Sequence, residues 1–426
     1  MHRVLIAILS LVTVLLWSVV SLAGIRAVPF EGEQDFNFKL VPAHVTLTAG
    51  KPALETNLNK AAYFNALLSG AERLADLQSA TDGGWDWEVD SSQASHSGTA
   101  SPVNTYGVTA MGVLGAYIRH GLASQQTVIQ NAFTGIEANT LIRTGGVPQF
   151  LIRAKQELGV QAYADTAKSR YDVRKALSPP NGTAGDRARQ IRDARCGGGL
   201  CNGIIPWDIG LVAVDAFEVA NEFGGTYGDD VDSMAKVIYD VMFAGDTTYF
   251  NWTNRDEWWW TLGLAGALDG LVASGDYSTE VETLLDTLLK YQLPDNSWEW
   301  HGGIYGGIGD WQTTAYVVKA LMSYADIVGG PRKLEACQAA AQGAWWLVGE
   351  QQAYNKGWYY HDVSVGVDGY CENTEVEGEI LWALHLGIEC GYTSTPSFTS
   401  FGYFALPALM VVLAVVFFVR RKKAIA

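Results

Sequence analysis

Six polar or acidic side chains recur at one kind of position, at or just before the start of segments that are apolar on nearly all sides. They are Asn104, Asp208, Glu257, Asp310, Glu372 and Glu375. Carboxylates that converge on one site can act as general acid and base, or can hold a cation such as calcium. Aspartate and asparagine at such positions can instead simply cap a helix. From this set we take Asp310, Glu257 and Glu375 as candidate catalytic residues, and Asp208 and Asn104 as candidate ligand contacts.

Histidines and aromatic residues lie in loops of the same class. His301 follows Trp298-Glu299-Trp300 and His361 follows Trp358-Tyr359-Tyr360, so the two segments look alike. Histidine is the usual general base near neutral pH, although a loop histidine can also be purely structural. Aromatic rings stack on sugars in a polar cavity and hold polyisoprenes or cationic intermediates in an apolar one. We therefore add His301 and His361 as candidate catalytic residues, and predict ligand contacts from Trp258, Trp259, Trp311 and Tyr305.

The segments that must position these residues are helices. Segments with one apolar stripe alternate with segments that are apolar nearly all round, which indicates outer and inner helices. The predicted pairs are 54–78 with 104–120, 124–142 with 145–158, 161–177 with 207–223, 229–243 with 256–274, 279–292 with 310–327, and 334–352 with 373–387. A period of about 50–60 residues is typical of a repeat architecture. We predict an all-α fold, an (α/α)6 toroid whose inner helices surround a central cavity.

The segment 160–205 interrupts this regularity. It contains a basic, polar run with Pro179-Pro180-Asn181-Gly182 and ends at Cys196 and Cys201. We expect an insertion loop closed by a Cys196–Cys201 disulfide, although long loops can also bind ligands. In an exported chain, five cysteines fit one or two disulfides and a spare thiol. We expect Cys371 to pair with Cys390, with Cys337 as the alternative partner.

Three segments share a glutamine followed by a tryptophan. They are Leu74…Gln78…Gly83-Gly84-Trp85, Leu288…Gln292…Asn296-Ser297-Trp298 and Leu347…Gln351…Gly357-Trp358. The glutamine can cap the end of an outer helix, the tryptophan can pack over the junction, and glycine permits a tight turn. These segments resemble the QW repeats of triterpene cyclases such as squalene–hopene cyclase, whose toroid is shared by protein prenyltransferases. The resemblance covers residues 54–390 and implies a terpene cyclase/prenyltransferase-like domain.

The resemblance also implies a catalytic motif, Asp-x-Asp-Asp-Thr-Ala, whose central acid protonates an alkene. The nearest segment runs from Asp310 to Ala315 and has Gln312 in the central position. Since an amide cannot act as a strong acid, we do not expect standard squalene cyclase chemistry. A prenyltransferase-type zinc site would need Asp368, Cys371 and His385 to converge, at a spacing that differs from that of the family. We therefore predict no metal ligands.

Both ends of the chain carry apolar segments. Residues 1–23 begin with a basic start, continue with an apolar run and end with small residues, which is typical of a secretory signal. Residues 403–419 are almost wholly apolar, long enough to cross a bilayer, and a basic cluster follows them. Together with Pro396-Ser397-Phe398 they resemble prokaryotic surface-sorting signals, with an ordinary membrane anchor as the alternative. We predict a signal peptide (1–23), a toroid ectodomain (24–395) and an anchor segment (396–426) that holds an exported protein at the cell surface, in the cytoplasmic membrane.

Charge and composition exclude other classes of protein. The chain has 426 residues, of which 29 are basic and 45 acidic. Five of the basic residues lie in the two end segments, so residues 24–395 keep 24 basic against 45 acidic residues, a net charge of −21. Such a domain is a poor partner for nucleic acid, and 15 tryptophans exclude disorder. We expect part of the negative charge to gather at one mouth of the ring.

The predicted function follows from the fold and the cavity. The primary interpretation is an exported, terpene cyclase/prenyltransferase-like toroid with an acidic, aromatic-rich central cavity for a small molecule or a glycan. The alternatives are a glycan-degrading hydrolase or lyase, and a non-catalytic surface protein that binds its ligand in the same cavity. No cofactor follows with certainty, and calcium is the one candidate.

Overall fold

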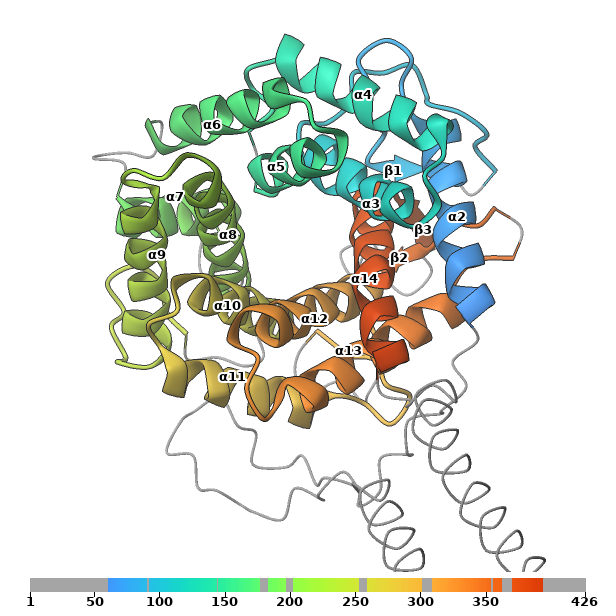
Figure 1. Ribbon diagram of the computed structural model, residues 1–426. Helices are drawn as coiled ribbons and strands as arrows, with labels where there is room; N and C mark the ends of the chain where they lie inside the picture. The colour runs from blue at the N-terminus through green and yellow to red at the C-terminus, as the bar shows by residue number, and fades with distance from the viewer. Residues whose placement is uncertain are drawn as a thin grey trace, which may run out of the picture. The chain divides into compact units, whose positions relative to one another are not determined.

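The computed structural model describes residues 60–89, 92–143, 145–176, 183–196, 202–252, 259–300, 309–353, 355–361 and 370–393. Helices dominate these ranges and form two concentric rings (Figure 1). The inner helices are α3 (Thr105–His120), α5 (Val147–Leu158), α8 (Ile205–Phe223), α10 (Trp260–Ser274), α12 (Trp311–Ser323) and α14 (Thr374–Thr393). The outer helices are α2 (Lys60–Leu77), α4 (Ala123–Ala138), α6 (Gln161–Ala176), α9 (Tyr227–Met242), α11 (Ser278–Tyr291) and α13 (Lys333–Gly349).

The inner ring is closed. Each inner helix packs against the next one along the chain, and α14 packs back against α3. Each outer helix packs against at least one of the inner helices beside it, and α2 contacts both α3 and α14. The six predicted helix pairs are therefore present in the predicted order, and the predicted (α/α)6 toroid is confirmed.

Glycine allows the inner helices to approach closely. A side chain on Gly210 of α8 would collide with the backbone of Gly266 on α10, and one on Gly112 of α3 would collide with Gly378 on α14. Burial is equally complete, because every residue from Trp260 to Ala273 of α10 is buried. This explains why the inner segments are apolar nearly all round.

Three equivalent joints fix the outer helices to the segments that follow them. The indole N–H of each joint tryptophan donates to the outer helix just before it: Trp85 to the Leu74 carbonyl, Trp298 to Leu288 and Trp358 to Leu347, at 2.7, 2.7 and 2.8 Å. All three rings are fully buried. The tryptophan therefore has the packing role that its spacing predicts, with its polar atom satisfied.

The glutamine of each joint links two repeats. Its side-chain amide donates to a carbonyl in its own turn and to a second carbonyl on the next outer helix around the ring. The pairs of acceptors are Gly83 and Val128 for Gln78, Asn296 and Ala339 for Gln292, and Lys356 and Ala66 for Gln351. The acceptor in the turn has a left-handed backbone in every case, with φ values of 75°, 77° and 69°. We call these three glutamine–tryptophan units the Gln–Trp joints.

Two features differ from the prediction. The insertion is not only a loop, because it contains helix α7 (Ala184–Cys196), which packs against α8 and α9 with Ala188 and Ile191 buried. A short 3-10 helix, Asn202–Ile204, then leads into α8, and a π-helical turn, Tyr324–Val328, ends α12. The chain also forms a small antiparallel sheet of β1 (Glu88–Val89), β3 (Tyr370–Asn373) and β2 (Tyr359–His361), in that order. This sheet joins the first repeat to the last.

The ends of the chain fall outside the part described. The predicted signal peptide (1–23) and anchor segment (396–426) both lie there, so these boundaries remain predictions. Within the described ranges, no helix is long and apolar enough to cross a membrane.

Candidate functional site

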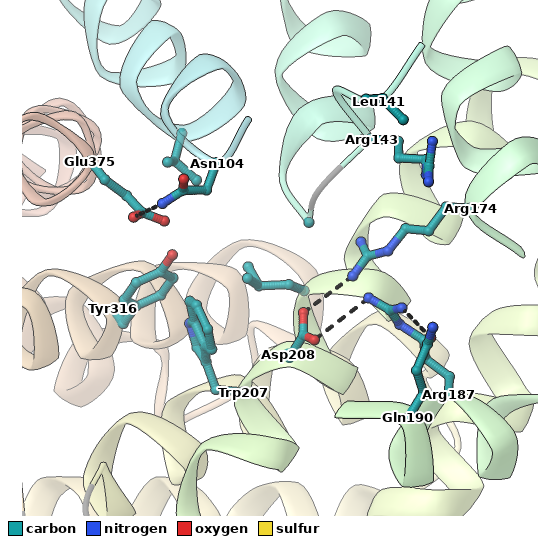
Figure 2. Close-up of a pocket in the computed structure, with 13 residues that line it drawn as sticks. Asn104, Leu141, Arg143, Arg174, Arg187, Gln190, Trp207, Asp208, Tyr316 and Glu375 are labelled. Carbon is teal, nitrogen blue, oxygen red and sulfur yellow. Dashed lines mark hydrogen bonds and ion pairs between the residues drawn. The ribbon is translucent and has the colours of Figure 1, made fainter. Parts of the chain in front are cut away.

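A cavity lies where the inner helices begin. It has a volume of about 260 Å³, and its lining comes from the starts of α3, α8 and α14, from α12, and from the α4–α5 connection, α6 and α7. Asn104, Asp208 and Glu375 all line it (Figure 2). Because the inner helices run parallel, their first turns meet at one mouth of the ring, and this brings together side chains that are far apart in sequence.

One wall of the cavity carries the carboxylate of Glu375. Asn104 Nδ2 donates to Glu375 Oε2 at 2.6 Å, and the indole N–H of Trp87 donates to the same oxygen at 2.8 Å. An ionised carboxylate is an acceptor at both oxygens, so this arrangement suits the charged form. The donors come from the loop before α3 and from the residue before β1, so the start of the first repeat orients a residue of the last.

Tyr316 connects this wall to a second acid deeper in the ring. Its hydroxyl donates to Glu379 Oε1 at 2.8 Å, and Gln312 donates to Glu379 Oε2 at 3.0 Å. Burial, reinforced by the charge of Glu375, raises the pKa of Glu379 well above its usual range, and burial also raises that of Tyr316. Glu379 and Tyr316 line a small inner cavity of about 30 Å³, and Tyr316 also lines the large one. Tyr316 is therefore a link between a proton-holding carboxyl and the open cavity.

The opposite wall is basic, which corrects the expectation of an electronegative mouth. Arg143, Arg174 and Arg187 all line it (Figure 2). Asp208 lies between two of them, with Oδ1 at 3.2 Å from Arg174 Nη2 and Oδ2 at 3.7 Å from Arg187 Nη2. The cavity is thus divided into an acidic side on α14 and a basic side on α6, α7 and the α4–α5 connection.

A further aspartate lies behind the basic wall. Asp215 is fully buried and accepts hydrogen bonds from the backbone N–H groups of Gly146 and Gln149 at 3.1 and 3.0 Å. Arg174 Nη1 lies 3.6 Å from its Oδ2. Burial nevertheless outweighs these partners and raises the pKa of Asp215 to about 7. This carboxyl is therefore a weaker source of negative charge near neutral pH than a solvated aspartate.

Three other predicted residues that the structure describes lie elsewhere. Asp310 caps α12, because its Oδ1 accepts a hydrogen bond from the Thr313 N–H at 2.7 Å. Trp311 lies against α13, with its ring 6.3 Å from that of Trp346. Trp259 precedes α10 with a left-handed backbone (φ 62°), and its ring lies 6.4 Å from that of Trp300. None of the three lines either of the two cavities described above.

Several other predictions cannot be placed. Glu257, Trp258, His301, Tyr305 and Cys201 lie outside the described residues, and only the backbone is described for His361, Cys196, Cys371 and Cys390. Cys337 on α13 is disulfide-bonded, so it is not the spare thiol. A disulfide at Cys337 agrees with the alternative expectation, in which Cys337 rather than Cys390 takes part in pairing.

Metal binding finds no support in the described ranges. They hold no group of three or more histidine, cysteine or acidic side chains that could bind a metal ion. His385, a candidate zinc ligand in the sequence, is buried, and its Nδ1 accepts a hydrogen bond from Arg119 Nε at 3.0 Å. Burial and the charge of Arg119 lower the pKa of His385 to about 3. The expectation of calcium therefore rests on no cluster in this part of the chain.

The residues of the site that sequence reasoning missed include Arg143, Arg174, Arg187, Trp207, Tyr316 and Glu379. A signal existed for Glu379, because its spacing of four from Glu375 places the two acids on one face of a helix. The basic run in the insertion was a signal for Arg174 and Arg187, since it supplies both. Gln312, which stands where the cyclase motif has its central acid, also belongs to the site, because its side-chain amide donates a hydrogen bond to Glu379.

No family model and no curated protein matches the sequence. Solved structures match the fold. The unsaturated glucuronyl hydrolase of Bacillus sp. GL1 has a TM-score of 0.56 at 12% identity, over 76% of this chain and 96% of that one. An unsaturated glucuronyl hydrolase specific for heparin has a TM-score of 0.52 at 14% identity, over 78% and 98%. An inactive α-1,6-mannanase variant of Salegentibacter sp. HEL1_6, in complex with α-1,6-mannotriose, has a TM-score of 0.51 at 12% identity, over 77% and 99%.

These neighbours are α/α toroids that act on glycans, and at such identities the likeness concerns the fold alone. The terpene cyclase interpretation rests on sequence segments only, and none of these three structures is a terpene cyclase. The chain therefore has the (α/α)6 toroid fold found in glycan hydrolases.

Proposed function

We propose that this chain is a glycan-active enzyme of the hydrolase or lyase class, with its active site in the 260 Å³ cavity. One observation carries the proposal. The Glu375 carboxylate and the Tyr316 hydroxyl, which is hydrogen-bonded to the proton-holding Glu379, both line a cavity that Trp207 also lines. An acid, a base and an aromatic surface in one cleft are the groups that glycosidic bond cleavage needs.

The roles follow from the surroundings of each group. Glu375 is the base, because its carboxylate accepts hydrogen bonds from the neutral donors Asn104 and Trp87. Tyr316 is the proton donor to the substrate. In the protonated state of Glu379 the hydrogen bond between the two groups reverses, so that the carboxyl gives its proton to the Tyr316 oxygen as the Tyr316 proton passes to the substrate. In hydrolysis, the donor protonates the glycosidic oxygen as its bond to the anomeric carbon breaks, while Glu375 takes a proton from the attacking water.

The ring of Trp207 supports binding of a sugar. It lies edge-on to Tyr316 at 5.3 Å between ring centroids, at the floor of the cavity between the two charged walls. The cavity volume of about 260 Å³ lies just below the usual range for ligand pockets, about 300–1,000 Å³, so it suits a small ligand such as a sugar. The charged walls disfavour a polyisoprene, because apolar chains leave buried charges without partners.

We also propose that the protein works outside the cytoplasm, tethered through residues 396–426. The disulfide at Cys337 supports an oxidising compartment. Soluble polysaccharides are available there, which agrees with a glycan substrate.

The test uses purified full-length protein and a panel of neutral and acidic polysaccharides. Release of reducing ends reports hydrolysis, and ultraviolet absorbance of an unsaturated product reports a lyase. Glu375→Gln should lower kcat on the active substrate by about 10²–10⁴-fold, as expected for loss of a general base. Its melting temperature should stay close to that of the wild type, because glutamine can keep at least one of the two hydrogen bonds.

Glu157→Gln is the matched control. Glu157 is an exposed glutamate on the inner helix α5 that lines neither cavity. This variant should retain wild-type activity. Turnover by Glu375→Gln at the wild-type rate, or no turnover of any glycan by the wild type, would refute the proposed reaction.

A further inference from the structure

The basic wall of the cavity brings three guanidinium groups together, those of Arg143, Arg174 and Arg187. Two of them have acidic neighbours, because Arg174 and Arg187 both lie near the carboxylate of Asp208, and Arg174 also lies near Asp215. Arg143 forms no ion pair in the described ranges, so its positive charge is an excess over the ion pairs of this wall.

Arg143 contributes the excess. Its Nη1 donates to the backbone carbonyl of Thr140 at 3.0 Å, and it forms no ion pair with any residue in the described ranges. The side chain is only half-buried, and it lines the cavity next to Arg174 and Leu141 (Figure 2). A guanidinium presents five donors in a planar fork, and one backbone carbonyl uses only part of that capacity.

This excess is unusual for its surroundings. The chain as a whole carries a net charge of −16. A concentration of cations in one cavity of an acidic protein focuses a positive potential at that point. Partly buried charge is costly unless it is paired, so the arrangement is stabilised when an anionic group enters.

The rest of the cavity fixes how such a ligand would lie. Trp207 lies between the two walls, and Tyr316 and Glu375 lie on the far side from the arginines (Figure 2). A sugar whose ring lies over the aromatic residues can therefore direct one substituent to each wall. An anionic substituent is attracted to the arginines and repelled by Glu375, so only one orientation is favourable.

We propose that the cavity selects acidic glycans, sugars that carry a carboxylate or a sulfate ester, and that Arg143 binds this anionic group. Carboxylate and sulfate both match the bidentate geometry of a guanidinium. The inference rests on the proposed function, since it names the substrate class of the same site.

Binding measurements test it without turnover. Isothermal titration of the full-length Glu375→Gln protein uses four probes: a galacturonate trisaccharide, a hyaluronan tetrasaccharide, a sulfated chondroitin disaccharide and a neutral galactose trisaccharide. At least one acidic probe should bind about tenfold or more tightly than the neutral one, with an affinity that falls as salt rises. Inorganic sulfate should compete only weakly, because it lacks the ring that Trp207 and Tyr316 would contact.

Variants of Arg143 locate the effect. In the same background, Arg143→Gln should weaken the acidic probe by about tenfold and leave the neutral probe unchanged, while Arg143→Lys should keep part of the difference. Arg192→Gln is the matched control, because Arg192 lies on α7 outside the cavity and pairs with the exposed Asp193. It should leave all four affinities unchanged.

The outcomes separate this inference from the proposed reaction. Equal or tighter binding of the neutral probe, absence of binding by every acidic probe, or an acidic affinity that Arg143→Gln does not change would overturn the selectivity. The wild type could still cleave neutral glycans in a Glu375-dependent manner, and the proposed reaction would then stand alone. Arg143-dependent binding of acidic probes without turnover by the wild type would instead leave a selective binding protein.

Discussion

Four glutamates between positions 372 and 379 form two pairs with opposite surroundings. Glu372 and Glu377 lie where the last repeat meets the first, and Arg73 of α2 binds both oxygens of Glu372 at 2.7 and 2.9 Å. Glu375 and Glu379 line the two cavities and accept hydrogen bonds from neutral groups. We call these the closure pair and the cavity pair. The comparison indicates that a glutamate paired with a buried arginine has a structural role, whereas a glutamate held only by neutral donors can still exchange a proton with a substrate.

The closure pair should dominate stability. The side chain of Glu372 is only 1% exposed, so Arg73→Met leaves a buried carboxylate without its cation. Loss of one partner from a buried ion pair costs about 3–5 kcal/mol, so the free energy of unfolding should fall by that amount. Chemical denaturation followed by circular dichroism measures it.

Arg192→Met provides the comparison, because its ion pair with Asp193 is exposed and such pairs contribute about 0–1 kcal/mol. The double variant Arg73→Met/Glu372→Gln should recover part of the loss, since no unpaired charge remains. A loss below about 1 kcal/mol for Arg73→Met would show that closure depends on other contacts.

The cavity pair should dominate activity. Glu379→Gln keeps acceptor and donor atoms near Tyr316 and Gln312 but holds no transferable proton. Because Glu379 acts through Tyr316, kcat should fall by roughly 10–100-fold, less than for Glu375→Gln. The free energy of unfolding should change by about 1 kcal/mol or less, since the amide is nearly isosteric.

The pH profile distinguishes proton supply from mere packing. In the wild type, activity should fall at alkaline pH as Glu379 loses its proton, because burial sets its pKa well above the usual range. Glu379→Gln should lack this alkaline limb. A variant that is slower but keeps the wild-type profile would assign Glu379 a packing role only.

The smallest expected effect concerns the second acid of the closure pair. Burial and the neighbouring Glu372 raise the pKa of Glu377 well above its usual range, so the native state holds a proton that the unfolded chain releases. Such a group stabilises the fold below the unfolded pKa, and this stabilisation is lost as pH rises toward the folded pKa. The free energy of unfolding should therefore fall from about pH 5 upward. In the Glu377→Gln variant the free energy of unfolding should fall by about 1 kcal/mol less than in the wild type over the same pH range.

The exposed Glu157→Gln serves again as the reference and should follow the wild-type curve. Parallel curves for Glu377→Gln and the wild type would mean that Glu377 ionises alike in the folded and unfolded chains.

The sequence predicts the helical framework well because its signals are local. The predicted inner helix 104–120 is observed as Thr105–His120, since its apolar character and the glycine that follows mark both ends. The sheet was missed because β1 has only two residues, too few for an alternating pattern. Helix α7 was missed because its mean composition is polar and Pro179-Pro180 precedes it.

The site divides in the same way. Asn104, Asp208 and Glu375 could be found because each marks the start of an inner helix, which is a local property. Asp310 has the same local signal, but its carboxylate caps α12 and lines neither cavity. Arg143 and Arg187 reach the cavity only because α7 and the α4–α5 connection fold against α8, and no local pattern encodes that packing.

The Gln–Trp joints carry one last consequence. An open array of helix pairs has a first and a last unit, which need special polar faces and are where fraying begins. Here the bond from Gln351 to the Ala66 carbonyl repeats, between the last unit and the first, the bond that Gln78 makes to Val128. The array therefore has no terminal unit at which stepwise unfolding could begin. Loss of order should be a single cooperative event in which all six helix pairs come apart together.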